Sequence, residues 1–304
     1  MGVRLGPHGT FAQLLESARS RGARRCVVAC AEDCATVEAL VEAGREGIAR
    51  GVLYGDRERI ATICSSLKAE CSPFEVHHVD GQEAAVAAAV QDVAQGGGFL
   101  MKGQVESSVF LRGVLDEANG LRGDRILSHV AYLELPAYHK ALAITDGGIN
   151  AELDLKRKID IVRNAIDLSR FLGNPKPNVA LLSAVERIKL NMAETLDWAI
   201  ITRMAEQGEF GEAVVEGPVA VDVALSRHAA QIKKVVSAVA GDVDILVVPS
   251  MATGNILAKG LQYLGGAKAC GIVVGARRPI VMLSRADTPE TKLYSMALGN
   301  IASL

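Results

Sequence analysis

The sequence has few aromatic residues and almost no net charge. Aromatics make up 4% of the 304 residues, and 33 basic residues nearly balance 35 acidic ones. A core built mainly from Ala, Val, Leu and Ile, together with 30 glycines, favours an α/β protein over a β-sandwich. The balanced charge gives no general electrostatic attraction to nucleic acid or to a membrane surface, so we expect neither as a partner.

Long apolar runs and targeting segments are also missing. No run reaches the length of about 18 apolar residues that a membrane-spanning helix needs. The N-terminal residues lack both an apolar signal segment and a small-residue cleavage site. We therefore expect a cytoplasmic protein, and at this length about two domains.

The six cysteines include no C-x-x-C pair. Cys26, Cys30 and Cys34 are spaced by four residues, which raises the hypothesis of a metal site. No further Cys or His residues stand at ligand spacing, and cytosolic cysteines usually behave as small buried hydrophobic residues. We expect that role for all six and predict no metal site.

Apolar runs of strand length alternate with amphipathic stretches of helical length. The predicted helices span 10–21, 36–48, 57–69, 82–95, 107–118, 154–172, 190–206, 255–264 and 288–301. The predicted strands span 26–31, 51–56, 74–79, 99–103, 178–184, 244–250, 271–276 and 279–284. This alternation predicts βαβ units and a mainly parallel sheet. Residues 126–135 and 141–146 are instead expected to form an antiparallel hairpin, which marks a new domain or a sheet extension.

Three predicted strand-to-helix junctions carry groups suited to an anion. The junction near the C-terminus, PIVMLSRADTPE, places Ser284 and Arg285 after a strand and before a helix capped by Asp287 or Thr288. Ligands of parallel α/β folds bind at such strand ends, where a helix N-terminus and an arginine both favour phosphate. A surface arginine that caps or pairs is the alternative reading.

The other two junctions give weaker evidence for anion binding. VPSMATGNILAK places Gly254 and Asn255 at a helix start and Lys259 one turn further, where Asn255 can bind a ligand or act as a plain N-cap. In LMKGQVESSVFLR, a strand ends at Lys102, and the next helix begins near a pair of serines and an arginine: Ser107, Ser108 and Arg112. Capping and a surface arginine are the alternative explanation of these residues, and the sequence alone favours it slightly. The fingerprints G-x-G-x-x-G after the first strand, G-x-x-x-x-G-K-[ST] and G-x-S-x-G are all absent.

With these motifs in view, the chain resembles the phosphate acetyltransferase / phosphate butyryltransferase family. The likeness rests on LMKG with the serines and arginine after it, on ILSHVAYLELP and ITDGGIN, on VPSMATGNILAK, and on YLGGAKACGIVVGARRPIVMLSRADTPETKLYSMA. It covers residues 98–302, and the N-terminal third is less distinctive. Ser-Arg-Ala-Asp at 284–287 is closer to the butyryl branch than the Ser-Arg-Gly of acetyl enzymes.

The resemblance implies a two-domain α/β/α fold related to the isocitrate and isopropylmalate dehydrogenases, with the active site in a cleft between the domains. The first domain would be discontinuous, residues 1–130 plus 277–304, and residues 131–276 would form the second and carry a homodimer or higher oligomer interface. The implied reaction is the reversible conversion of acyl-CoA and phosphate into acyl phosphate and CoA. It implies coenzyme A as a substrate and no metal or redox cofactor.

The resemblance also implies roles for single residues. Arg285 would hold phosphate, and Ser284 would hydrogen-bond the phosphate or the oxyanion. Gly254, Asn255 and Lys259 would line the cleft. Four residues of the first domain would contact phosphate or the CoA phosphates: Lys102, Ser107, Ser108 and Arg112.

One position departs from the family pattern. Acetyl enzymes carry an Asp seven residues after the serine, thought to act as the base, and this chain has Thr291 there. Asp287 and Glu290 are the nearby carboxylates, and solvent under a positive field is a third route to the CoA thiolate.

Two other functions stay open at this point. A metal- and NAD-dependent dehydrogenase of the same fold needs an Asp cluster, whereas Asp242 and Asp244 flank the start of a predicted strand. A non-catalytic CoA- or acyl-phosphate-binding protein would use the same residues as the enzyme. The acyl chain, about two to five carbons, is not fixed by the sequence, since each methylene changes binding by only about 1–3 kcal/mol.

Overall fold

The computed structural model describes residues 9–67, 74–282, 284 and 287–303. It divides into two compact units. The first unit comprises Phe11–Arg125 and Cys270–Leu304, and the second unit comprises Met1–Thr10 and Ile126–Ala269.

The first unit is built on parallel strands. It contains β1 (Arg24–Ala29), β2 (Ala49–Gly55), β3 (Glu75–His78), β4 (Phe99–Lys102), β11 (Ile280–Val281) and most of β10 (Lys268–Val274), in the order β3-β2-β1-β4-β11-β10. All neighbouring pairs are parallel except β10 and β11. The chain places β2 and β3 on one side of β1 and then returns to place β4 on the other side, so the strand order reverses between β1 and β4.

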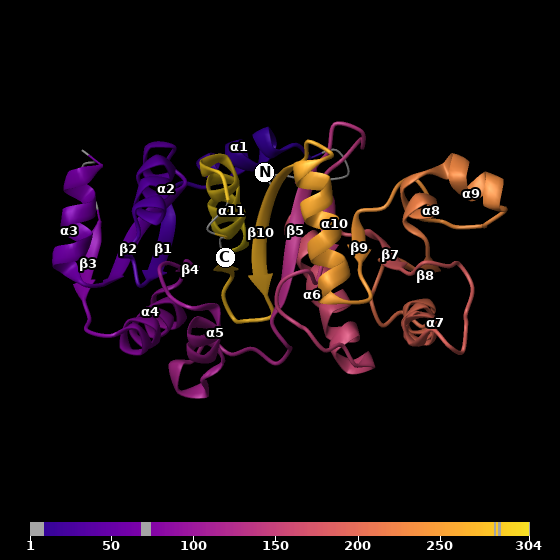
Figure 1. Cartoon of the computed structure of the whole chain (residues 1–304), viewed down its shortest axis with the longest axis horizontal. Coiled ribbons are helices and arrows are strands. Elements are labelled where there is room, and N and C mark those ends of the chain that lie inside the picture. The colour runs from indigo at the N-terminus through magenta and orange to yellow at the C-terminus, as the bar shows by residue number, and fades with distance from the viewer. Residues whose placement is uncertain (1–8, 68–73, 283, 285–286, 304) are drawn as a thin grey trace. The chain divides into compact units, whose positions relative to one another are not determined.

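Helices cover this sheet in two layers (Figure 1). The helices α1 (Phe11–Ser20), α2 (Cys34–Arg45), α3 (Arg57–Ser66) and α11 (Pro289–Ala302) form one layer, and α4 (Gln82–Gly96) and α5 (Ser107–Leu115) with the short turn η1 (Glu117–Asn119) form the other. Buried Val and Ala residues of β1 separate them, with Val27, Val28 and Ala29 fully buried. The burial of these small side chains explains how a chain so poor in aromatics fills its core.

The last helix begins as its sequence predicts. Thr288 caps α11 by accepting a hydrogen bond from the backbone N–H of Thr291, and Pro289 occupies the first turn. Of the two caps that the sequence left open, Thr288 is therefore the one used.

The second unit holds a mixed sheet. Its strands are β5 (Ser128–Glu134), β6 (Leu142–Thr145), β7 (Asn178–Leu182), β8 (Val214–Val219) and β9 (Ile245–Val247), in the order β5-β6-β9-β7-β8. The predicted antiparallel hairpin is confirmed as β5 and β6, and the remaining pairs are parallel. The helices are α6 (Leu155–Phe171), α7 (Ala193–Glu206), α8 (Val221–Leu225), α9 (Arg227–Lys233) and α10 (Met251–Tyr263), and α8, α9 and α10 share one apolar cluster with the sheet.

Several sequence predictions need correction. β8, α8 and α9 were not predicted, because β8 is broken by Gly217-Pro218 and the two helices are too short for a clear period. α10 begins at Met251 rather than 255, since Ser250 caps it by accepting a bond from Thr253 N. Two cysteines also differ from the expectation of buried free thiols: Cys34 is exposed and Cys64 is disulfide-bonded.

Candidate functional site

A cavity lies where the strand order of the first unit reverses. Reversal points at the carboxyl ends of parallel strands are where open α/β sheets bind ligands, because the two outgoing loops diverge there. The cavity has a volume of about 300 Å³. Its lining comes from the loop and helix after β1, from the loop after β4 and from the segment after β11: Asp33, Ala35, Thr36, Lys102, Gly103, Gln104, Val105, Ser284 and Lys292.

The loop after β4 is held tightly against the end of β1. Gly103 N donates to Ala29 O at 3.0 Å, and Gln104 N donates to Cys30 O at 2.7 Å. A Cβ on Gly103 would collide with the Cys30 carbonyl oxygen, so only glycine allows this approach. Cys30 itself has a φ of 59°, a left-handed conformation that costs a non-glycine residue about 1–3 kcal/mol and concentrates at functional sites.

Lys102 and Ser284 both line the cavity. The Lys102 ammonium donates to Val105 O at 2.8 Å and to Gly103 O at 3.3 Å, so it braces its own loop while lying in the cavity wall. Ser284 is exposed. Arg285, the proposed phosphate ligand, lies outside the described residues.

Asp287 closes the turn that presents Ser284. Its Oδ2 accepts the Ser284 backbone N–H at 2.7 Å, and its own N–H donates to Ser284 O at 3.1 Å. These two bonds join Asp287 directly to Ser284.

The other residues near the start of α11 point elsewhere. Glu290 accepts a hydrogen bond from Tyr294 OH at 2.7 Å and lines a separate cavity of about 450 Å³ between α2 and α11. Thr291, which replaces the family's Asp, is buried and hydrogen-bonds Thr288 through both its N–H and its hydroxyl.

Among the lining residues with polar side chains, sequence reasoning missed four: Asp33, Thr36, Gln104 and Lys292. Asp33 caps α2 by accepting from Thr36 N at 2.9 Å, and Thr36 Oγ1 also bonds to it. Lys292 is 8% exposed. Lys292 directly follows Thr291, the position that differs from the family pattern, and stands eight residues after Ser284. This nearness to the motif was the signal in the sequence that could have indicated Lys292.

The serines and arginine of α5 do not line this cavity. Ser107 and Ser108 are exposed in the first turn of α5, and Glu106 rather than a serine stands at the N-cap. Arg112 lies 3.7 Å from Glu83 and its side chain is 73% exposed. The structure therefore leaves a binding role for these three residues as a prediction.

Gly254, Asn255 and Lys259 belong to the second unit. Gly254 is buried against Gly147, where a Cβ on either glycine would meet the other's backbone. Asn255 Nδ2 donates to Gly147 O at 3.3 Å, so Asn255 is not the N-cap of α10. The Lys259 ammonium lies 5.9 Å from the Tyr263 ring centroid, a cation–π distance.

The Gly147 loop is ordered by a fully buried carboxylate. Asp146 accepts from Gly148 N at 2.9 Å, from Ile149 N at 3.1 Å and from Asn150 Nδ2 at 2.6 Å. These N–H donors hold the Asp146 carboxylate in one position. The ITDGGIN motif is thus a rigid support for the start of α10.

The Cys30 thiol is poorly suited to nucleophilic chemistry. Burial, followed by the charge of Glu32, raises the pKa of Cys30 to about 11, and the charge of Lys102 only partly opposes this. Because the thiolate is the reactive form, Cys30 remains a thiol at neutral pH.

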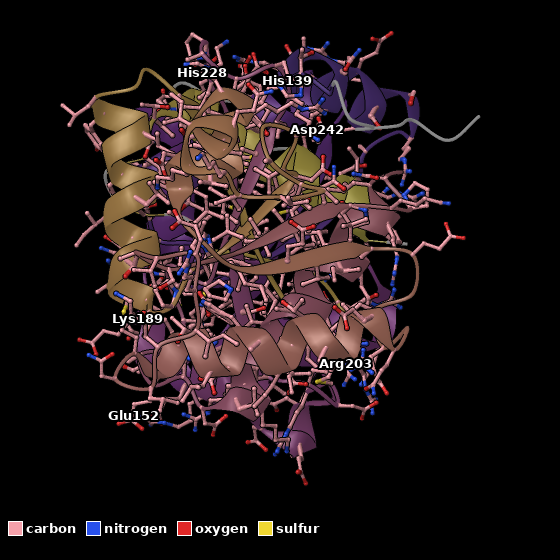
Figure 2. All side chains as sticks on the ribbon, turned by 90° about the vertical axis from the view of Figure 1, so that its right-hand side faces the viewer. His139, Glu152, Lys189, Arg203, His228 and Asp242 are labelled. Carbon is pink, nitrogen blue, oxygen red and sulfur yellow. The ribbon has the colours of Figure 1, made fainter. Side chains whose placement is uncertain are left out.

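Asp242 and Asp244 contact a buried lysine at the amino ends of the second unit's strands. Lys140 Nζ lies 3.1 Å from Asp242 Oδ1 and 2.7 Å from Asp244 Oδ1. His139 Nε2 lies 2.9 Å from Asp242 Oδ1, and Figure 2 shows the two side chains close together. These acids form an ion-pair network, and within the described ranges no three His, Cys, Asp or Glu residues are grouped so as to hold a metal.

Among the described residues, no helix combines the length and the apolar character needed to cross a bilayer.

Comparison with solved structures supports the fold. The branched-chain phosphotransacylase from Enterococcus faecalis V583 superposes with a TM-score of 0.80 and 30% identity, over 92% of this chain and all of that one. A 4-hydroxythreonine-4-phosphate dehydrogenase from Klebsiella pneumoniae gives a TM-score of 0.59 at 14% identity, over 92% of this chain and all of that one, which indicates a shared fold alone. The predicted relation to dehydrogenase-like folds is confirmed.

Comparison of sequences identifies the family. The chain is 37% identical to phosphate butyryltransferase of Clostridium acetobutylicum, over 97% of this chain and 98% of that protein. It is 38% identical to phosphate acetyltransferase of Rhizobium meliloti, over 95% of this chain and 92% of that protein. The model of the family described as phosphate acetyl/butaryl transferase matches residues 83–299. The chain therefore belongs to this family of acyltransferases.

Proposed function

We propose that this protein catalyses acyl-CoA + phosphate ⇌ acyl phosphate + CoA. The observation that carries the proposal is the cavity at the strand-order reversal, where Lys102 and Ser284 of the family motifs meet. Cationic and hydroxyl groups beside a helix N-terminus suit a phosphate and a developing oxyanion. Membership of the family and the near full-length likeness to two named transferases support the same reaction.

In the proposed mechanism, the CoA thiolate attacks the carbonyl carbon of the acyl phosphate. The C–S bond forms as the C–O bond to phosphate breaks, and phosphate leaves with the electron pair. Ser284 donates its hydroxyl proton in a hydrogen bond to the oxyanion or the phosphate, and Arg285 clamps the phosphate. Asp287 keeps the serine turn in place, while the thiol proton leaves to solvent under the positive field of the cavity or to a nearby carboxylate.

The acyl chain is proposed to be short, either butyryl or acetyl. Proteins with both names match this chain at nearly equal identity, 37% and 38%. The likeness therefore does not favour one chain over the other.

Phosphate-dependent release of free CoA thiol tests the reaction. Acetyl-, propionyl-, butyryl-, isobutyryl- and valeryl-CoA are assayed in parallel, each with and without phosphate, in protein shown to be folded by circular dichroism. Release that requires phosphate supports the transferase, and the ratio of kcat/KM values sets the chain preference. Absence of release with all five would refute the proposal for these chains and leave the binding-protein alternative.

We also propose that Gly254, Asn255 and Lys259 contribute to the same reaction. The enzyme would have two domains, one made of residues 1–130 with 277–304 and the other of residues 131–276.

The second domain is further proposed to form a homodimer. Exposed apolar side chains of α10 and its C-cap support the dimer: Ile256 is 73%, Tyr263 67% and the C-cap Leu264 91% exposed. Sedimentation of wild type against Ile256→Glu/Leu264→Glu tests the interface, and a dimer that survives both charges would exclude it. Cytoplasmic location and the absence of a cofactor stay predictions.

A further inference from the structure

Lys292 is a buried cation without a counter-ion among the residues that the structure describes. It is the fourth residue of α11, a helix that packs against α2, and the residue is 8% exposed. Its backbone N–H bonds to Thr288 O, but in the described part of the chain its ammonium makes no hydrogen bond, ion pair or cation–π contact. Removing an ammonium ion from water is strongly unfavourable unless a partner replaces the water.

The position of Lys292 shows where that partner can come from. Lys292 and Ala35 are the two residues that line both the 300 Å³ cavity and the 450 Å³ cavity. Among the described residues, the larger cavity is lined by Glu38, Glu42 and Glu290 against the single further cation Arg45, so this lining does not favour an anion.

The smaller cavity has the opposite charge balance. Lys102 and Lys292 face one carboxylate, Asp33, which already accepts the N–H and the hydroxyl of Thr36 at the N-cap of α2. The N-terminus of α2 adds partial positive charge at the same wall. An anion is therefore attracted to the smaller cavity, which also contains Ser284.

We propose that Lys292 binds a phosphate oxygen of the substrate in the cavity that it shares with Lys102 and Ser284. This assignment rests on the proposed function, and it makes the bound phosphate the counter-ion that the described part of the chain does not supply. The phosphate belongs either to inorganic phosphate and acyl phosphate or to coenzyme A, since both present the same anionic oxygens. The ammonium acts as a compact point charge on a flexible stem, as phosphate-binding lysines do.

Thermal unfolding tests the inference without relying on turnover. Wild type, Lys292→Met and Lys292→Arg are each melted alone and with inorganic phosphate, CoA or 3′-dephospho-CoA, because a ligand of the native state raises the Tm by an amount that grows with the logarithm of its affinity. Lys176→Met is the matched control, since Lys176 is exposed and pairs with Glu212 in the second unit. If Lys292→Met does not fold, Lys292→Gln takes its place.

We expect Lys292→Met alone to melt at or above the wild-type Tm, because an unpaired buried charge is gone. Its affinity for phosphate should fall about tenfold or more, while Lys292→Arg retains most of it and Lys176→Met all of it. Loss of the CoA shift with an intact phosphate shift would assign the contact to CoA, and 3′-dephospho-CoA then separates the 3′-phosphate from the diphosphate.

Two results would overturn the inference. The first is a Lys292→Met variant whose Tm rises with phosphate and with CoA as much as that of wild type. The second is a Lys292→Met variant that melts below wild type without ligand but keeps both ligand-induced Tm shifts, which would assign Lys292 a structural role. Failure of the proposed function is distinguishable from either. A wild type that binds phosphate but releases no CoA would refute the reaction and keep the phosphate site.

Discussion

Buried lysines have opposite surroundings in the two units. In the second unit, Lys140 contacts Asp242 and Asp244, and Lys158 lies 2.6 Å from Asp197 and over the Trp198 ring. In the first unit, Lys292 is similarly buried, but no carboxylate of the described segments pairs with it. The chain supplies counter-ions where a buried cation serves the fold, and the proposal is that a substrate supplies one where the cation serves the reaction.

The largest expected effect concerns the paired lysine. Lys140→Met leaves Asp244, with its side chain 11% exposed, without its cation, and breaking a buried pair typically costs about 3–5 kcal/mol. We expect a loss of this size in the free energy of unfolding, measured in urea, and an unchanged Tm shift by phosphate. A Lys140→Met protein as stable as wild type would remove the contrast with Lys292.

Two glycines extend the comparison to the backbone. Gly103→Ala drives a Cβ into the Cys30 carbonyl, and we expect a loss of about 2 kcal/mol in stability together with reduced turnover. Gly260, in the interior of α10, has open space at its Cβ, so Gly260→Ala is expected to stabilise by about 0.5–1 kcal/mol. Urea unfolding and the CoA-release assay measure both. Equal effects of the two substitutions would show that the first unit's loop has no special need for glycine.

Arg285 tests the anion-binding role of the first unit directly. We expect Arg285→Ala to lower turnover about tenfold or more, which corresponds to about 1.4 kcal/mol of transition-state stabilisation. Arg203→Ala is a suitable control, because Arg203 is an exposed residue of α7 that pairs with Glu206. A fully active Arg285→Ala enzyme would refute the phosphate clamp.

The two carboxylates near Ser284 should differ from each other. Asp287→Ala removes the acceptor of the Ser284 N–H, a bond worth about 1 kcal/mol, so turnover should fall several-fold. Asp287→Asn retains an acceptor oxygen and should keep most activity, and Glu290→Gln should stay close to wild type. If Asn fails as badly as Ala, Asp287 acts as a base rather than a positioning residue. Wild-type activity in all three variants would eliminate a local carboxylate base.

The smallest expected effect is a pH dependence in the second unit. Burial tends to raise the pKa of Asp242, but hydrogen bonds and charge from His139 and Lys140 bring it below the ordinary value of 3.8. The folded state thus binds this proton less readily than the unfolded state, so the stabilisation is present above pH 3.8 and is lost as the pH falls through the folded pKa. Asp242→Asn should flatten the stability profile in this acid range, as followed by urea titrations at several pH values. An unchanged slope would show that Asp242 contributes nothing there.

Much of the fold follows from local sequence pattern. The hairpin of β5 and β6, the helices of regular length and the start of α11 at Thr288 and Pro289 were all predictable, because hydrophobic period and capping chemistry act over a few residues. β8, α8 and α9 were not, because Gly217-Pro218 interrupts the strand pattern and helices of 5 and 7 residues carry little periodicity.

For the site, the sequence by itself determined the chemistry available at the strand ends: Lys102 and Gly103 after one strand, Ser284 and Asp287 after another. It could not show that Asp33 and Thr36 join them, since that depends on β4 lying beside β1, far from it in the chain. Nor could it show the state of Lys292, because a lysine in a helix is exposed by default. Only the packing of α11 against α2 and the sheet buries this ammonium beside the cavity, and long-range packing of that kind leaves no local pattern in the sequence.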